Sequence, residues 1–260
     1  MVKRPANDLD LYKQFVKTIF KMRYKGSMLG FLWVLMKPFF MFTILFIVFS
    51  ATAGSASNLT SKEYAVYLLS GLIVFTFFSE SIIWGMNSIM DRSGLIVKIN
   101  FKREIAVTSS ISMAVINLTI NSGIILLLAV ILGVNLSFMG LLYVLFIFLT
   151  MFIALYAFSL FSSLWLVHIR DLSHIMELVL QLLFYASAVF FPVSLIPERF
   201  RFIVHYNPIA RFILAVREAL ISQKITDFNF ILGSFAVAVI ALIIGRIYFK
   251  RNILKIAEYF

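Results

Sequence analysis

The feature that most limits how this chain folds is an uncharged stretch of 65 residues, 105–169. The stretch contains no Asp, Glu, Lys or Arg and is rich in Leu, Ile and Phe. A helix that crosses a membrane needs about 20 mostly apolar residues, so there is room here for two such helices. The sequence Gly-Val-Asn-Leu-Ser at 133–137 predicts the turn between them. Such a segment requires lipid around it, because burying so much apolar surface away from water is otherwise impossible.

Shorter uncharged stretches recur along the rest of the chain. We predict six transmembrane helices, at 34–53, 64–89, 106–132, 139–167, 174–192 and 228–248. Only 13% of the 260 residues are charged, whereas about 25% are charged in a soluble domain. A membrane β-barrel would show short alternating strands between turns. The continuous apolar stretches instead predict an all-α membrane protein, with residues 1–260 forming one transmembrane domain.

The distribution of Lys and Arg predicts the orientation. With six spans and the N-terminus inside, 17 of the 23 basic residues fall on the cytoplasmic side, as the positive-inside rule requires. The other six are predicted to lie outside: Lys62, Arg199, Arg201, Arg211, Arg217 and Lys224. We therefore expect a multi-pass protein of the cytoplasmic (inner) membrane with both termini in the cytoplasm. The net charge of +11 then reflects topology and lipid headgroups rather than nucleic-acid binding.

Residues 8–25 have the pattern of an amphipathic helix. Apolar residues recur at helical spacing, and Lys13, Lys17 and Lys21 form a row at intervals of four. Such a helix lies in the headgroup plane with its lysines on anionic lipid. It is either a simple membrane anchor or an interface helix that also contacts a cytosolic partner. In the second case Arg23 and Tyr24 would belong to the same contact surface as the lysines.

The cytoplasmic connector at 90–104 combines charges with apolar residues in the sequence DRSGLIVKINFKRE from Asp91 onward. A tether without other function would more often be polar throughout. One interpretation is a short helix that docks on a partner; the other is a segment that lies on the headgroups. The charged residues assigned to docking are Asp91, Arg92, Lys98, Arg103 and Glu104.

The segment at 193–224, predicted to lie outside, stays apolar between its charges. Asn207-Pro208 predicts a helix start, with Asn as the cap and Pro at the first helical position. Non-helical backbone at membrane depth is tolerated only against protein or water, so a re-entrant hairpin here would line or gate a pathway. An ordinary external loop with surface helices is the alternative.

Four aromatic residues, Phe184, Tyr185, Phe190 and Phe191, gather at the external end of the predicted fifth span. They either pack at the membrane interface, as aromatic residues commonly do, or line a path on which sugar rings stack. With Asn207 and Pro208 they form the candidate channel and gate.

Little in the sequence indicates catalysis. No Walker A loop is present, so ATP hydrolysis by that route is not expected in this chain. His168, His174 and His205 form no HExxH motif, and there are no Cys residues. We predict no catalytic residue, no metal site and no cofactor in this chain.

Glu80 is the one acid predicted to lie well within a span. It either bonds to a neighbouring helix or serves in a proton relay. Arg170 and Asp171, between the fourth and fifth spans, are assigned the same two open roles.

Several short motifs carry a resemblance to a known family, and their order along the chain makes the set specific. They are RYKGSMLG at 23–30 with Trp33 and Pro38, YLLSGL at 67–72, KINFKREI at 98–105, RDL at 170–172, FFP at 190–192, Ile196-Pro197, Asn207-Pro208, Arg217 and Ala257-Glu258. In these features the chain resembles the ABC-2 type permeases that export O-antigen, capsular polysaccharide and teichoic acid.

The resemblance implies an assembly of two permease copies with two copies of a separate ATPase, which binds ATP and Mg²⁺. The connector at 90–104 would be the coupling helix, residues 8–25 the interface helix and residues 193–224 the gate region. The implied substrate is polysaccharide linked to undecaprenyl diphosphate. Two alternatives are an ABC-2 exporter of a drug or small lipophile and a proton-coupled carrier or membrane enzyme.

Overall fold

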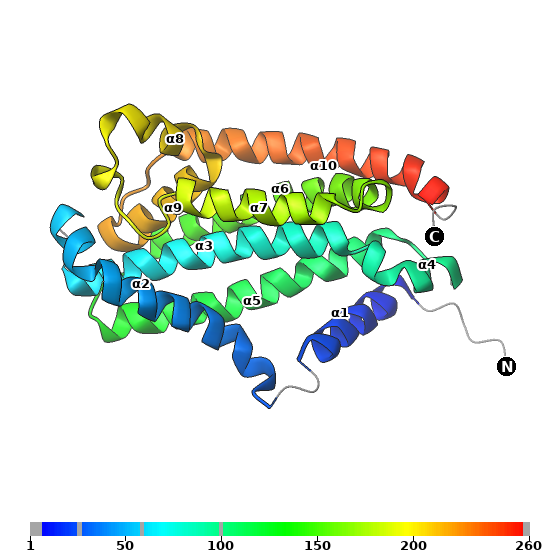
Figure 1. Ribbon diagram of the computed structural model, residues 1–260, viewed down its shortest axis with the longest axis horizontal. Coiled ribbons are helices and arrows are strands. Elements are labelled where there is room, and N and C mark those ends of the chain that lie inside the picture. The colour runs from blue at the N-terminus through cyan, green and yellow to red at the C-terminus, as the bar shows by residue number, and fades with distance from the viewer. Residues whose placement is uncertain (1–6, 25–27, 58–59, 99–100, 257–260) are drawn as a thin grey trace.

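The computed structural model describes residues 7–24, 28–57, 60–98 and 101–256, and the side chains among them except at 24, 51–57, 97, 255 and 256. These residues form helices joined by turns, with no strand in the described ranges (Figure 1). The predicted all-α fold is therefore confirmed. The helices are α1 (Asp8–Tyr24), α2 (Trp33–Ser57), α3 (Ser61–Asn87), α4 (Ser93–Lys98), α5 (Glu104–Ile131), α6 (Phe138–His168), α7 (Leu172–Ala186), α8 (Arg201–Tyr206), α9 (Pro208–Arg217) and α10 (Phe228–Ile256).

Within the described ranges five helices are long and apolar enough to cross a membrane: α2, α3, α5, α6 and α10. This makes the chain a multi-pass membrane protein. The predicted fifth span, at 174–192, is helical only as far as Ala186. The 15 residues of α7 rise about 22 Å, which is less than the roughly 30 Å of a bilayer core. The helix ends because the chain turns at Ala188, whose φ of +51° is incompatible with a continuing right-handed helix.

Local sequence signals account for several helix ends. Thr60 and Glu63 form a capping box at the start of α3, each side chain bonding the backbone N–H of the other. The turn predicted at 133–137 lies between α5 and α6. Gly133 has φ of +74° there, a conformation that glycine adopts without steric cost.

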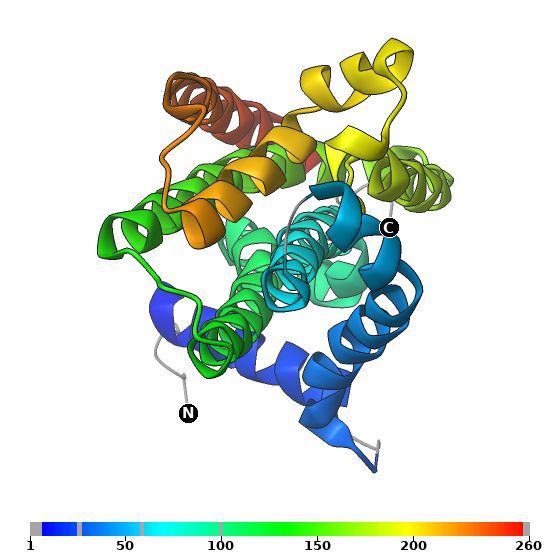
Figure 2. The ribbon, with the colours of Figure 1, turned by 90° about the vertical axis from the view of Figure 1, so that its left-hand side faces the viewer.

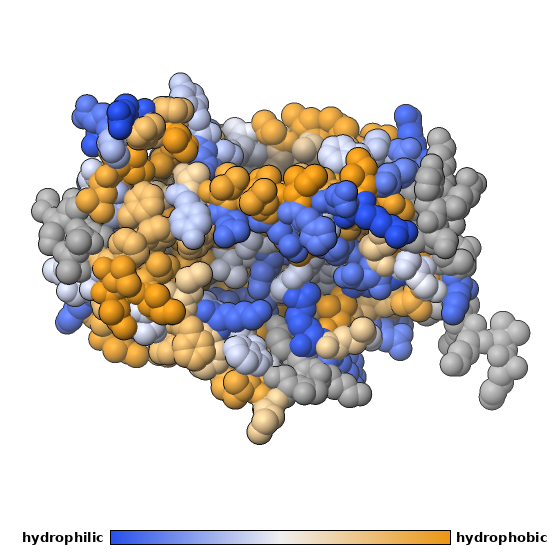
Figure 3. Space-filling view, viewed as in Figure 1, coloured by the Kyte–Doolittle hydropathy of each residue, from blue (hydrophilic) through white to orange (hydrophobic). Residues whose placement is uncertain are grey.

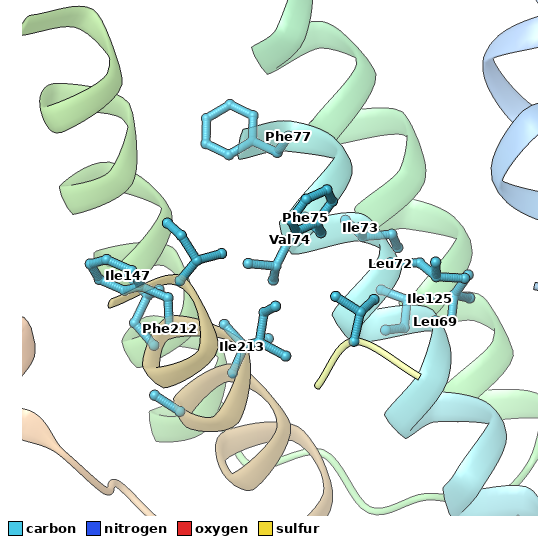
Figure 4. Packing of buried hydrophobic residues seen from close by; sticks show 14 of the residues in the cluster. Leu69, Leu72, Ile73, Val74, Phe75, Phe77, Ile125, Ile147, Phe212 and Ile213 are labelled. Carbon is cyan, nitrogen blue, oxygen red and sulfur yellow. The ribbon is translucent and has the colours of Figure 1, made fainter. Parts of the chain in front are cut away.

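Helix α3 is the centre of the bundle, with the other helices around it (Figure 2). In its apolar part 72% of the residues are buried, against 6–33% in the other four long helices. The core around it combines residues of α3, α5, α6 and α9, including Val74, Ile125, Ile147 and Ile213 (Figure 4). Burial of this kind fixes α3 relative to its neighbours, because close-packed side chains transmit displacement.

The outer faces of the remaining long helices stay apolar. Ile47 of α2, Leu145 of α6 and Val237 of α10 are among the large apolar side chains left exposed. Orange surface over much of Figure 3 reflects this composition. In a protein that spans a membrane, such faces are those that lipid covers.

The two regions predicted to have special roles lie at opposite ends of the bundle. The connector helix α4 lies at the end where α10 terminates, and α8 and α9 lie at the other end (Figure 1). Helix α1 packs on α5 beside the connector end, where the hydroxyls of Tyr12 and Ser112 lie 2.7 Å apart.

Candidate functional site

The helical part of the connector is shorter than predicted. Residues Met90–Arg92 form a 3-10 turn, α4 covers Ser93–Lys98, and α5 begins at Glu104. The described part of the predicted helix at 90–104 thus consists of two short helical pieces, and residues 101–103 before α5 are not helical. Residues 99 and 100 lie outside the described ranges. Ile96 anchors α4 in a small apolar cluster, whereas Leu95 and Lys98 are exposed.

Contacts with α1 and α5 fix the connector in place. Asp8 of α1 forms an ion pair with Lys102, and the rings of Phe15 and Phe101 meet edge to face at 5.4 Å. One guanidinium nitrogen of Arg92 donates to the Ser88 carbonyl at 2.8 Å and to the Ser110 hydroxyl at 2.9 Å. The predicted interface helix and the connector therefore form one continuous surface.

The connector is also joined to α10. The Glu104 carboxylate lies 3.8 Å from the Arg246 guanidinium, and Arg103 donates to the Ile253 carbonyl at 3.4 Å. Partial desolvation by the surrounding protein raises the pKa of the nearby Asp91 carboxyl above its ordinary value of 3.8. Desolvation likewise lowers the pKa of Arg92. The five charged residues predicted for docking thus lie on one end of the bundle, and three of them bond to neighbouring helices.

Helix α1 has the predicted amphipathic arrangement. Lys13, Lys17 and Lys21 are exposed along one side, and the apolar residues between them are half-buried. Arg23 stacks on the ring of Trp84 in α3 at 3.5 Å, so it faces the bundle rather than the lysine row. The side chain of Tyr24 lies outside the described ones.

Helix α7 is largely uncovered, with Leu180 its one buried residue. Four polar side chains, His174, Glu177, Gln181 and Tyr185, recur along it at spacings of three or four; we call them the polar stripe. All four are exposed. Figure 3 shows this hydrophilic row beside a row of exposed apolar residues along α7. The stripe was not predicted as a set, although its helical spacing is readable in the sequence.

The polar stripe is poorly suited to lipid. The carboxylate of Glu177 is 63% exposed and lies 3.9 Å from the His174 ring. A charge near the bilayer centre costs about 2.5–3.5 kcal/mol or more unless it faces protein or water. The stripe therefore marks a face of α7 that requires protein or water beside it.

The four predicted aromatic residues meet at the end of α7. Phe184 stacks on Phe190 at 5.8 Å, and Phe190 meets Phe191 edge to face at 4.9 Å. Phe190 also touches Phe49 of α2, at 4.9 Å between ring centres. Tyr185 remains exposed at the end of the polar stripe. The sequence prediction that these side chains gather is confirmed, and their role remains a prediction.

The last residue of α7, Ala186, and the irregular residues 187–191 after it are largely buried, and we call residues 186–191 the reversal. Their carbonyl oxygens accept hydrogen bonds from side chains instead of from helix backbone. The donors are the hydroxyls of Tyr64 and Tyr67 in α3, the Asn207 amide and the Arg217 guanidinium. Buried carbonyls need such partners, because an unsatisfied one costs several kcal/mol in a membrane.

Asn207 and Pro208 begin α9 as predicted. The Asn207 side-chain oxygen accepts from the backbone N–H of Ile209 at 3.0 Å and of Ala210 at 3.4 Å. The following helix packs on α3, with seven of its ten residues buried. In contrast, α8 leaves Phe202 and Tyr206 exposed. The segment 193–224 is thus part surface and part core.

Arg217, which was predicted to lie on the external side of the membrane, is buried within the protein, with 2% of its surface exposed. Its guanidinium lies over the Tyr67 ring at 3.6 Å and donates to carbonyls of α3 and of the reversal. Sequence reasoning missed this residue because its partners are far away in the chain. The one local signal is a cation at the end of an otherwise apolar face of α9.

Glu80, Arg170 and Asp171 do not form one site. Glu80 lies half-buried in α3 and accepts a hydrogen bond from Asn117 of α5 at 2.9 Å. Arg170 and Asp171 are exposed in the turn between α6 and α7. The described residues hold no group of three His, Cys, Asp or Glu side chains arranged for a metal ion.

A cavity of about 880 Å³ lies between α5 and α6 and reaches α3. Apolar side chains such as Ile73, Phe77, Leu126 and Leu145 line most of it. None of the polar stripe lines this cavity. Its lining suits hydrocarbon rather than a hydrated sugar, so the polar face of α7 is the better candidate for a hydrophilic path.

Comparison with known proteins assigns the chain to a family. The sequence profile of the ABC-2 type transporters matches residues 10–221. The chain belongs to this family. The matched region extends from α1 to the π-helical turn Glu218–Ser222 after α9, so it includes the connector, the polar stripe and the reversal.

The ABC-2 permease also has similar relatives along most of its length. It is 25% identical over 238 residues to an O-antigen export system permease protein RfbA of Klebsiella pneumoniae, covering 92% of this chain and 90% of the relative. It is 26% identical over 243 residues to a protein of the same name from Myxococcus xanthus, again covering 92% and 90%. The family resemblance predicted from the motifs is confirmed.

Proposed function

We propose that this ABC-2 permease is the membrane subunit of an ATP-driven exporter that moves polysaccharide on an undecaprenyl diphosphate carrier across the cytoplasmic membrane. The relatives named as O-antigen export permeases support this substrate class, since the similarity covers 92% of the chain. The structural observation that carries the proposal is the polar stripe of α7, which ends at an exposed tyrosine within an aromatic cluster.

A hydrophilic conduit forms where the polar stripes of two copies face each other. In a single copy Glu177 and Gln181 would lie against lipid, which is unfavourable for a charge. A second copy related by a two-fold axis removes this contact and encloses a water-filled path, because the same face meets itself. Tyr185 then lies along the path, where a ring with an apolar face and a hydroxyl suits the C–H faces and hydroxyls of sugars.

The partner that supplies energy is an ABC ATPase, two copies of which bind ATP and Mg²⁺. It docks on the surface formed by α1 and the connector, where Leu95 and Lys98 are exposed. Asp8 bonds to Lys102, and the ring of Phe15 contacts Phe101 and lies under the Arg92 guanidinium, so a movement of the ATPase would displace both segments together. This end of the bundle faces the cytoplasm, as the distribution of basic residues favours.

The fifth crossing consists of α7 followed by the reversal, and α9 then re-enters the membrane from outside. Helix α7 rises about 22 Å, so the outer part of the bilayer remains for the reversal to occupy. Seven buried residues in α9 support its lying among the helices rather than on a surface. The irregular backbone there is tolerated because side chains satisfy its carbonyls.

The deciding experiment is affinity purification of the tagged chain from its native membranes, with mass spectrometry of protein and lipid. We expect a stoichiometric P-loop ATPase together with a polyprenyl-linked glycan, which would also identify the glycan as O-antigen, teichoic acid or capsule. An ATPase without glycan would instead favour export of a small lipophile. Recovery of neither from an intact complex would contradict the proposal and return attention to a carrier role for Glu80.

A further inference from the structure

The reversal after α7 depends on side chains from two other helices. The Tyr64 hydroxyl donates to the Phe190 carbonyl at 2.8 Å, and the Tyr67 hydroxyl to the Phe191 carbonyl at 3.3 Å. The carbonyls of Ala188 and Val189 both accept from Arg217. Since the backbone here makes no helix, these bonds decide its path.

Among the described side chains, Arg217 is the one that donates hydrogen bonds to both α3 and the reversal. Its Nε donates to the Tyr67 carbonyl at 3.0 Å, one terminal nitrogen donates to the Ala188 carbonyl at 2.9 Å, and the other donates to the Val189 carbonyl. Among the described residues no carboxylate forms an ion pair with it. A planar guanidinium can contact several acceptors in fixed directions, whereas the ammonium of a lysine is a single point charge.

Two backbone features indicate that α3, Arg217 and the reversal are tightly packed against one another. A Cβ atom placed on Gly71 of α3 would lie 2.7 Å from the Val189 carbonyl oxygen and would overlap the Arg217 guanidinium. Ala188 has φ of +51°, a conformation that non-glycine residues rarely adopt. Such a conformation persists only where the surroundings fix it, and here they include Arg217 and the buried side of α3.

We infer that Arg217 is a positioning residue for export, which holds the reversal against α3 and thereby keeps Phe190 and Phe191 at the end of the polar stripe. The inference rests on the proposed function. Phe190 packs on Phe49, Phe184 and Phe191, so a displaced reversal would displace the whole aromatic cluster. Without Arg217 the buried carbonyls of Ala188 and Val189 lose their hydrogen-bond donor, and the contacts that hold Ala188 in its left-handed conformation are weakened.

Cysteine cross-linking tests this inference directly, because the chain contains no native Cys. The reporter pair is Phe49→Cys with Phe190→Cys, whose rings lie 4.9 Å apart in the native protein. The control pair is Phe15→Cys with Phe101→Cys at the opposite end of the bundle, where the rings lie 5.4 Å apart. Each pair is treated with a short bifunctional thiol reagent in membranes, and export is measured in the cysteine-free chain with its ATPase.

Arg217→Ala is expected to lower cross-linking of the reporter pair by at least about tenfold, which is the effect of losing even one of its charge-assisted hydrogen bonds, and to leave the control pair unchanged. Export should fall in parallel, and Arg217→Lys should restore part of both signals. Gly71→Ala should reproduce the loss without touching the charge, which keeps the test valid where Arg217→Ala fails to fold.

Three results would overturn the inference. Unchanged reporter cross-linking in both Arg217→Ala and Gly71→Ala would mean that the reversal does not depend on this contact. Loss of both cysteine pairs in all three variants would reduce Arg217 to a general folding role. A displaced reversal with normal export would separate the contact from transport. Failure of the wild-type chain to export any glycan would refute the proposed function instead, and leave the cross-linking result standing.

Discussion

Asn207 offers the sharpest test of how the reversal and α9 are stabilised, since its side chain makes two separable sets of bonds. Its oxygen caps α9, and its amide donates to the Ser187 hydroxyl at 2.8 Å and to the Ala186 carbonyl at 3.4 Å. Asn207 is 9% exposed and Ser187 fully buried. Losing the cap costs about 1 kcal/mol, and leaving a buried polar group without its partner about 1–3 kcal/mol.

Asn207→Ala should therefore destabilise the protein by about 3 kcal/mol, or about 10 °C in Tm for a chain of this size. Asn207→Ser keeps an oxygen for the cap and loses the amide donor, so we expect a loss of roughly half as much. Thermal unfolding of the purified chain in detergent, followed by the fluorescence of its three Trp residues, measures both variants. Asn252→Ala is the matched control, because its amide bonds only to the Tyr248 carbonyl in its own helix.

The reasoning fails if Asn207→Ala unfolds within about 1 °C of the wild type, since neither set of bonds would then stabilise the fold. Equal losses in Asn207→Ala and Asn207→Ser would assign the whole effect to the amide. A fall in export with unchanged Tm would instead favour the gate role predicted for Asn207 from the sequence.

Three further predictions concern other parts of the chain. Desolvation raises the pKa of Asp91, so ionisation of its carboxyl destabilises the folded protein as the pH rises above 3.8. Unfolding measurements should therefore find Asp91→Asn more stable than the wild type at pH 7, with the difference vanishing below about pH 4. A membrane-impermeant maleimide should label Gln181→Cys in the assembled exporter and spare Leu182→Cys, and equal labelling would argue against a water-filled path along the polar stripe. Glu80→Gln still accepts the bond from Asn117 and should keep export within about twofold, whereas Asn117→Leu should lower stability by about 1 kcal/mol or more. Abolished export in Glu80→Gln would favour the proton relay.

The spans and local caps were predictable, because their signals are contiguous in the sequence. An uncharged stretch identifies a helix such as α6, and Asn207-Pro208 specifies the start of α9 through atoms two and three residues away. The end of α7 was not predictable in the same way. Apolar residues continue beyond Ala186, so hydropathy extends the helix to 192. The helix ends there because side chains from other helices donate hydrogen bonds to the carbonyls of the reversal.

Long-range partners also explain why the candidate site was only partly predicted. Tyr64 and Phe190 are 126 residues apart, Arg217 and the Tyr67 carbonyl 150 apart, and Asn117 and Glu80 37 apart. No spacing rule links such pairs. From the sequence, Arg217 was therefore interpreted only as one of six external basic residues. In the described structure it is the most buried charged side chain.

The position of α3 relates the two ends of the permease. Its N-terminal half carries Tyr64 and Tyr67, which bond to the reversal, and its C-terminal end carries Trp84, on which Arg23 of α1 stacks. The helix between them is mostly buried, and packed cores shift between discrete arrangements rather than deform gradually. A displacement of α1 and the connector therefore reaches the reversal through a single helix. If α3 moves as a rigid body, the reversal must move with it, because Arg217 is bonded to both.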